Sequence, residues 1–126
     1  TRIKQEMGAD FAVTQLFFEV DLYKQFVARL AEAGVTMRVI PGVMLITSWK
    51  QVVRFCDTCG ATVAPHIREI FEPLADDDEA AYARGIEIVT EQCRDLLDCG
   101  APGLHFYCGN RFQPAATVLD NLGDFR

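Results

Sequence analysis

Short apolar runs typical of strands alternate with longer segments of helical periodicity, and this alternation constrains the fold more than any other feature. Residues 11–18, 37–40 and 104–107 are rich in β-branched and aromatic side chains, which indicates three buried strands. A helix-length segment follows each of them. Strands joined by helices pair in parallel, because a parallel pair needs a long crossover connection. We therefore predict one α/β domain over residues 1–126, opening with a short helical segment.

Residues that favour helix ends punctuate the pattern. Asp21 is expected to cap a helix with an apolar stripe on one face, and Gly34 to end that helix. Pro41-Gly42 is expected to end the second strand. Four later helices are expected. The first runs from a cap at Thr47 or Ser48 to Gly60, and the second from Pro65 to Phe71. The third begins at Asp76-Asp77-Asp78 and ends at Cys99-Gly100, and the fourth runs from Gln113 to Leu122.

Three strands cannot close a barrel, and a complete (β/α)8 barrel needs about 250 residues. With 126 residues, two architectures remain open: a small open α/β sheet, or part of a barrel whose other strands lie outside this chain. The sequence begins at Thr1-Arg2-Ile3-Lys4 in what reads as the middle of a helix. We therefore expect a piece of a longer polypeptide.

Charge and cysteine content exclude several classes of function. The formal net charge of −6 opposes binding to nucleic acids or anionic membranes. No apolar run approaches the length of a membrane span, and five cysteines without a signal peptide indicate reduced thiols in a cytoplasmic protein. Cys56 and Cys59 form a C-x-x-C on a predicted helix, without a second pair at zinc spacing. Core cysteines are therefore expected there, and no metal site.

Three motifs resemble those of a known family. They read GADFAVTQLFFE at residues 8–19, IPGV at residues 40–43 and HFYCGNR at residues 105–111. In order and separation they are similar to the methylenetetrahydrofolate reductases over nearly the whole chain. The resemblance implies the last three βα units of a (β/α)8 TIM barrel, incomplete in this chain. It also implies FAD-dependent reduction of methylenetetrahydrofolate to methyltetrahydrofolate, with NADH or NADPH as co-substrate.

The resemblance assigns roles to individual positions. The family's catalytic glutamate and its flavin-tuning aspartate lie on earlier strands, so this chain has no catalytic residue and is expected to be inactive alone. Lys4 matches a lysine that reaches the FAD phosphates, and Gln15 a glutamine that contacts folate and nicotinamide. The other substrate-binding residues that the resemblance implies are Gln51, Phe55, Tyr107 and Arg111.

Each of these side chains also has a simpler interpretation. An amide suits a pterin or nicotinamide ring, but Gln15 could instead be satisfied by the backbone at its strand end. Phe55 could stack on a folate or pack in the core, and Tyr107 could face the cavity or be buried. A guanidinium pairs with carboxylates, yet Arg111 could be solvated, and so could Lys4.

A function of a different class also stays open. Three strands leave two free sheet edges, and free edges invite pairing with other strands. The chain could therefore be a non-catalytic half-barrel subunit or scaffold. Its partner would be a second copy in a homo-oligomer or a complementary N-terminal half.

Overall fold

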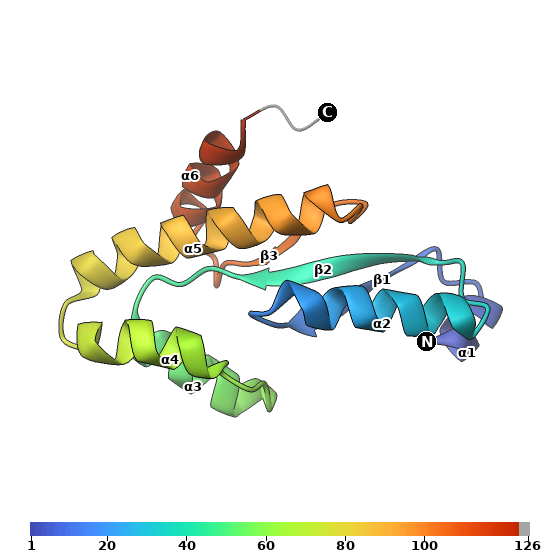
Figure 1. The fold of residues 1–126 in the computed structure, drawn as a ribbon, viewed down its shortest axis with the longest axis horizontal. Helices are drawn as coiled ribbons and strands as arrows, with labels where there is room; N and C mark the ends of the chain where they lie inside the picture. Colours follow the sequence, from blue (N-terminus) through green and yellow to red (C-terminus); the bar gives the residue numbers. More distant parts are fainter. Residues whose placement is uncertain (124–126) are drawn as a thin grey trace.

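The computed structural model of the protein describes residues 1–123. Strands and helices alternate as predicted (Figure 1). The elements are α1 (Arg2–Glu6), β1 (Phe11–Leu16), α2 (Val20–Glu32), β2 (Arg38–Met44), α3 (Trp49–Cys59), α4 (Pro65–Phe71), the 3-10 turn η1 (Glu72–Leu74), α5 (Asp78–Asp98), β3 (His105–Tyr107) and α6 (Gln113–Leu122). No helix within this described part is long and apolar enough to cross a membrane.

The three strands form one parallel sheet in the order β1-β2-β3, which confirms the predicted α/β class. Phe11 pairs with Arg38 at the start of the ladder between β1 and β2, and Gly42 pairs with His105 where β3 joins. In a parallel sheet the carboxyl ends of all strands lie at the same end of the sheet. The polar residues that end these strands are thereby gathered at the same place.

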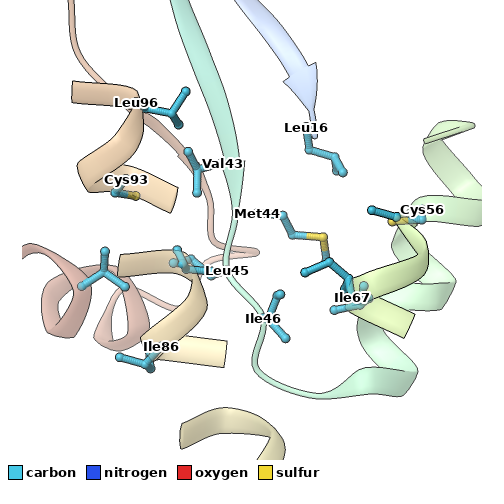
Figure 2. Close-up of a cluster of buried hydrophobic side chains, with 14 of the residues drawn as sticks. Leu16, Val43, Met44, Leu45, Ile46, Cys56, Ile67, Ile86, Cys93 and Leu96 are labelled. Carbon is cyan, nitrogen blue, oxygen red and sulfur yellow. The ribbon is translucent and has the colours of Figure 1, made fainter. Parts of the chain in front are cut away.

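The core surrounds the middle strand, β2, whose alternate side chains pack into hydrophobic clusters on opposite sides of the sheet (Figure 2). Val43 faces Cys93 and Leu96 on α5, whereas Met44 lies with Ile67 of α4 on the other side. Successive side chains of a strand point to opposite faces of the sheet, which explains this division. Both faces are therefore packed where β2 ends.

Close contact between α5 and the chain after β2 depends on Gly85. A Cβ atom at Gly85 would collide with the carbonyl oxygen of Ile46 and would lie 2.9 Å from the Ile46 Cβ. On the neighbouring helix α2, the buried hydroxyl of Tyr23 donates to the carbonyl of Val39 at 2.8 Å. These contacts hold both helices against the sheet.

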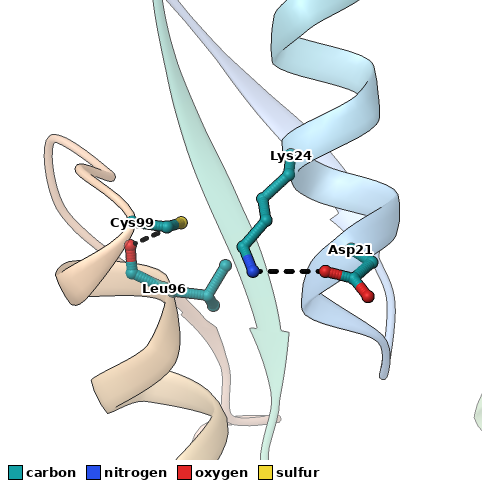
Figure 3. Close-up of polar contacts among 4 residues, drawn as sticks. All are labelled: Asp21, Lys24, Leu96 and Cys99. Carbon is teal, nitrogen blue, oxygen red and sulfur yellow. Dashed lines mark hydrogen bonds and ion pairs between the residues drawn. The ribbon is translucent and has the colours of Figure 1, made fainter.

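The start of α2 differs from the prediction. Glu19 occupies the N-cap position without a side-chain cap, and Asp21 lies in the first turn instead of capping the helix. There its carboxylate is favoured by the positive end of the helix and pairs with Lys24 at 3.2 Å. Figure 3 shows this pair beside the end of α5, where the Cys99 thiol donates to the Leu96 carbonyl.

Other predicted ends are confirmed. The Ser48 hydroxyl accepts from the backbone N–H of Gln51, and the Asp77 carboxylate accepts from that of Ala80. Gly60 ends α3 in the left-handed conformation, with φ of 65°.

Two strand predictions are wrong in detail. The first strand ends at Leu16 rather than at residue 18, and it is only half-buried, because Phe11 and Val13 are 57% and 39% exposed. It is an edge strand with one face uncovered in the described part of the chain. The second strand does not stop at Pro41-Gly42 but continues to Met44, because an irregularity in β1 accommodates the proline.

Candidate functional site

The irregularity lies at the carboxyl end of β1. Val13 pairs with Ile40 and Leu16 with Gly42, so Thr14 and Gln15 on β1 face the single residue Pro41 on β2. Proline has no backbone N–H and is found in sheets at edges or bulges. Bulges re-aim side chains and are common beside active sites.

The Thr14 side chain takes over the hydrogen bonding at the bulge. Its hydroxyl oxygen accepts from the backbone N–H of Gly42 at 2.9 Å and donates to the carbonyl of Gln15 at 2.8 Å. A side chain thus supplies the link between β1 and β2 that the regular ladder lacks here.

Gln15 is exposed at the end of this bulge. Its Oε1 accepts from the backbone N–H of Leu16 at 3.0 Å. Within residues 1–123 its Nε2 group makes no hydrogen bond to protein, so two N–H donors remain for a ligand. The backbone therefore satisfies the hydrogen bonding of the Gln15 side-chain oxygen, but not that of its amide nitrogen.

Tyr107 connects all three strands at the carboxyl end of the sheet. Its hydroxyl donates to the carbonyl of Thr14 at 3.0 Å, and its ring crosses over Gly42. A Cβ atom at Gly42 would lie 2.7 Å from both the tyrosine ring and the Thr14 oxygen. The ring meets His105 edge-on at 4.9 Å and lies 6.4 Å from the ring of Phe55. The structure thereby brings Tyr107 and Phe55 together and ties the tyrosine to Thr14, the residue before Gln15.

Gln51 and Phe55 lie four residues apart on α3, on one side of the helix as predicted. Gln51 is exposed, and its Oε1 accepts from the Thr47 hydroxyl at 2.7 Å. Phe55 is half-buried, between the core and ligand interpretations. One side of the Phe55 ring already packs against Tyr107.

Arg111 lies after β3 and lines a separate hollow of about 420 Å³. Thr47 and Ser48 line the same hollow, so it borders the start of α3, about two turns before Phe55. Asp78 and Glu79 line it as well. A ligand carboxylate that pairs with Arg111 would therefore meet two protein carboxylates nearby.

Lys4 is not brought to this group. It is exposed on α1, which precedes β1, whereas Gln15 ends that strand (Figure 1). Both residues line an elongated hollow of about 420 Å³ between β1 and α2. They border it from opposite ends of the strand.

Sequence reasoning missed two polar residues at the site. Thr14 was part of a motif but received no role of its own. Gln92 is buried on α5, and its Nε2 donates to the carbonyl of Phe17 at 2.8 Å, just beyond β1. A polar residue between Val89 and Cys93 on an apolar helix face was the available signal.

Two of the five cysteines, Cys56 and Cys93, lie in the core. Cys56 is buried as predicted, and burial raises the pKa of its thiol. Burial also raises the pKa of Cys93 to about 12. The thiolate is the reactive form, and burial disfavours it at both positions. Residues 1–123 contain no group of three or more His, Cys, Asp or Glu residues that could hold a metal ion.

Comparison with known proteins assigns this arrangement to a family. The sequence profile of the family "Methylenetetrahydrofolate reductase" matches residues 2–123. The chain is 37% identical to a probable methylenetetrahydrofolate reductase (NADPH) of Caenorhabditis elegans over 97% of its length and 19% of the relative. It is 36% identical to methylenetetrahydrofolate reductase (NADH) 1 of Arabidopsis thaliana, over 95% of the chain and 20% of the relative.

A bacterial relative is similar over the same region. The chain is 31% identical to the 5,10-methylenetetrahydrofolate reductase of Escherichia coli, over 95% of the chain and 40% of the relative. The chain thus spans about a fifth of the nematode and plant relatives and two fifths of the bacterial one. Because the family profile matches almost every residue, the chain belongs to the methylenetetrahydrofolate reductase family.

Proposed function

We propose that this chain is the C-terminal part of the catalytic barrel of a methylenetetrahydrofolate reductase and forms its last three βα units. The family match over residues 2–123 and the open parallel sheet support this assignment. A barrel places its chemistry at the carboxyl ends of its strands. Gln15 and Tyr107 lie near the carboxyl ends of β1 and β3, with Phe55 beside the tyrosine ring, and this placement is the observation that carries the proposal.

The reaction is the reduction of methylenetetrahydrofolate to methyltetrahydrofolate. FAD, when bound, supplies the hydride transfer between a nicotinamide cofactor and the folate. The names of the relatives include both NADH and NADPH, and either is the co-substrate proposed here. The chain fits only part of FAD, because Lys4 is the one cationic side chain that lines the hollow between α1, β1 and α2 within the described residues. A lysine suits a phosphate, and the rest of the cofactor needs residues from elsewhere.

The substrate-side residues act by binding and orientation. Gln15 presents N–H donors to a carbonyl of the pterin or the nicotinamide, since its oxygen is already bonded to Leu16. Phe55 offers the free part of its ring for stacking. Gln51 extends this surface by one helical turn. Arg111 is the residue proposed to pair with the carboxylates of the folate glutamate, in a hollow that it shares with Asp78 and Glu79.

A second candidate function is a non-catalytic half-barrel that pairs with a partner chain, either a copy of itself or a complementary N-terminal half. The exposed apolar side chains of Phe11 and Val13 on the edge strand favour it. Gel filtration of the 126-residue chain with absorbance in the flavin band separates the two functions. A colourless oligomer supports the scaffold, and flavin uptake only with a second chain supports a divided enzyme.

The proposal is tested on the full-length protein with Gln15→Ala. Stopped-flow traces should show slower flavin reduction by NADH or NADPH and slower reoxidation by methylenetetrahydrofolate. The loss of one uncharged hydrogen bond corresponds to about 0.5–1.5 kcal/mol. Gln25→Ala, on the exposed side of α2, is the matched control and should leave both steps unchanged. Wild-type traces for Gln15→Ala would reject the role.

A further inference from the structure

The bulge opposite Pro41 joins two neighbouring residues through a single peptide unit. The carbonyl of Gln15 and the N–H of Leu16 belong to the same planar peptide. The carbonyl accepts from the Thr14 hydroxyl at 2.8 Å, and the N–H donates to Oε1 of the Gln15 side chain at 3.0 Å. The Thr14 hydroxyl therefore fixes the plane that in turn holds the Gln15 amide.

The Thr14 hydroxyl is itself held in place. It accepts from the backbone N–H of Gly42 at 2.9 Å, so the middle strand fixes its position. Tyr107 holds the carbonyl of the same residue at 3.0 Å, which fixes the other side of the bulge. Each of these bonds spans the sheet rather than one strand. Rotation of the Gln15–Leu16 peptide would therefore break its bond to the Thr14 hydroxyl, which the neighbouring strand holds in place.

We infer that Thr14 is a positioning residue, which aims the amide donors of Gln15 at the substrate through the Gln15–Leu16 peptide. The inference rests on the proposed function of Gln15 and adds the residue on which that function depends. The Thr14 hydroxyl is bonded on both sides by backbone groups, so its proton is already donated within the protein. Its removal should loosen the amide and leave the groups of the ligand site chemically intact.

The test compares Thr14→Val and Thr14→Ser in the full-length protein, because valine keeps the shape and loses the hydroxyl whereas serine keeps the hydroxyl. Thr14→Val should slow flavin reduction and reoxidation by about three- to tenfold, and Thr14→Ser should restore most of the rate. Thr117→Val is the matched control. Its hydroxyl bonds only to a carbonyl of its own helix, so the rates should not change.

A double-mutant cycle separates a positioning role from a general structural one. In a Gln15→Ala background, Thr14→Val should change the two rates by less than about twofold, since residues that act through one another are not additive. A full further loss in that background would overturn the inference, as would wild-type rates for Thr14→Val. If Gln15→Ala alone has no effect, the proposed function fails instead.

A variant that does not fold leaves a second route. Tyr107→Phe removes the bond to the Thr14 carbonyl and keeps the Thr14 side chain and the aromatic ring. The same cycle with Gln15→Ala should again give less than about twofold further loss. Additive effects of Tyr107→Phe and Gln15→Ala would overturn the inference on this route.

Discussion

The α5 side of the sheet, made of β2, α5 and α6, is packed far more completely than the β1 edge, made of α1, β1 and the outward side of α2. On the α5 side, Val43, Cys93 and Leu96 are completely buried. At the β1 edge, Leu22 and Phe11 are more than half exposed. Neighbouring large apolar side chains that are exposed together usually mark a surface that binds another protein or segment. The contrast teaches that β2 and α5 enclose a closed core, whereas the β1 edge leaves large apolar side chains exposed in the described part of the chain.

The largest expected effect compares one leucine from each region. Leu96→Ala should reduce the free energy of unfolding by about 2–5 kcal/mol, because it leaves a cavity in a closed core. Leu22→Ala should cost less than about 1 kcal/mol in the 126-residue chain, since this side chain is 52% exposed. Urea unfolding of both variants measures the difference.

The same pair sharpens the comparison in the full-length protein. If the β1 edge is covered there, Leu22→Ala should become clearly more costly than in the 126-residue chain, and Leu96→Ala should not change. Equal costs of Leu22→Ala in both proteins would show that the β1 edge remains exposed to solvent.

Alkaline pH should weaken the α5 side next. Burial raises the pKa of Cys93 from its ordinary value of 9.0 to about 12. The unfolded chain therefore loses this proton first, so the stabilisation is complete below pH 9 and is lost as the pH rises towards 12. The slope should be about 1.4 kcal/mol per pH unit. The buried Tyr23 acts in the same direction, because burial raises its pKa.

Unfolding curves between pH 8 and pH 11 test this expectation. Cys93→Ala should flatten the dependence, whereas Cys99→Ala, on an exposed residue, should not. An unchanged slope in Cys93→Ala would mean that another group is responsible.

A smaller effect is expected where α5 meets the end of β2. Gly85→Ala places a methyl group against the backbone of Ile46 and should cost about 1–3 kcal/mol. Gly103→Ala is the matched control, because its Cβ would meet no atom within 4 Å. Thermal melts should therefore separate the two substitutions. A harmless Gly85→Ala would show that the helix can move away from the sheet.

The smallest expected effect concerns Phe55, which is half-buried and thus intermediate between the closed core and the exposed β1 edge. Its truncation to alanine should weaken folate binding by about 0.5–1.5 kcal/mol if the ring stacks on the ligand. Phe71→Ala is the control for a core phenylalanine and should cost about 3–5 kcal/mol of stability. A Phe55→Ala variant that loses as much stability as Phe71→Ala, with unchanged folate affinity, would assign this ring to the core.

Local signals in the sequence predicted most of the fold. The alternation of strand and helix predicts parallel pairing, and Ser48, Gly60 and Asp77 mark helix ends through chemistry that acts within a few residues. The failures are those that depend on distant partners. Pro41-Gly42 resembles a strand end in isolation, and only the bulge in β1 lets β2 continue past it.

The candidate site was predictable in part for the same reason. The spacing on α3 places Gln51 and Phe55 on one side of the helix, whereas the role expected of Gln15 comes from the resemblance to the family. Nothing local reveals that the Tyr107 hydroxyl is bonded to Thr14, or that Gln92 reaches Phe17. These contacts depend on how the elements pack against one another.

The bond between Tyr107 and Thr14 also has a consequence for the order of assembly. It joins residues 93 positions apart in the sequence, and Gln92 and Phe17 are 75 apart. Contacts of such high sequence separation carry a large loop-closure entropy and form late in folding. During synthesis, Gln15 emerges from the ribosome long before the tyrosine that anchors its strand end. The geometry of Gln15 is therefore completed only when the last strand docks.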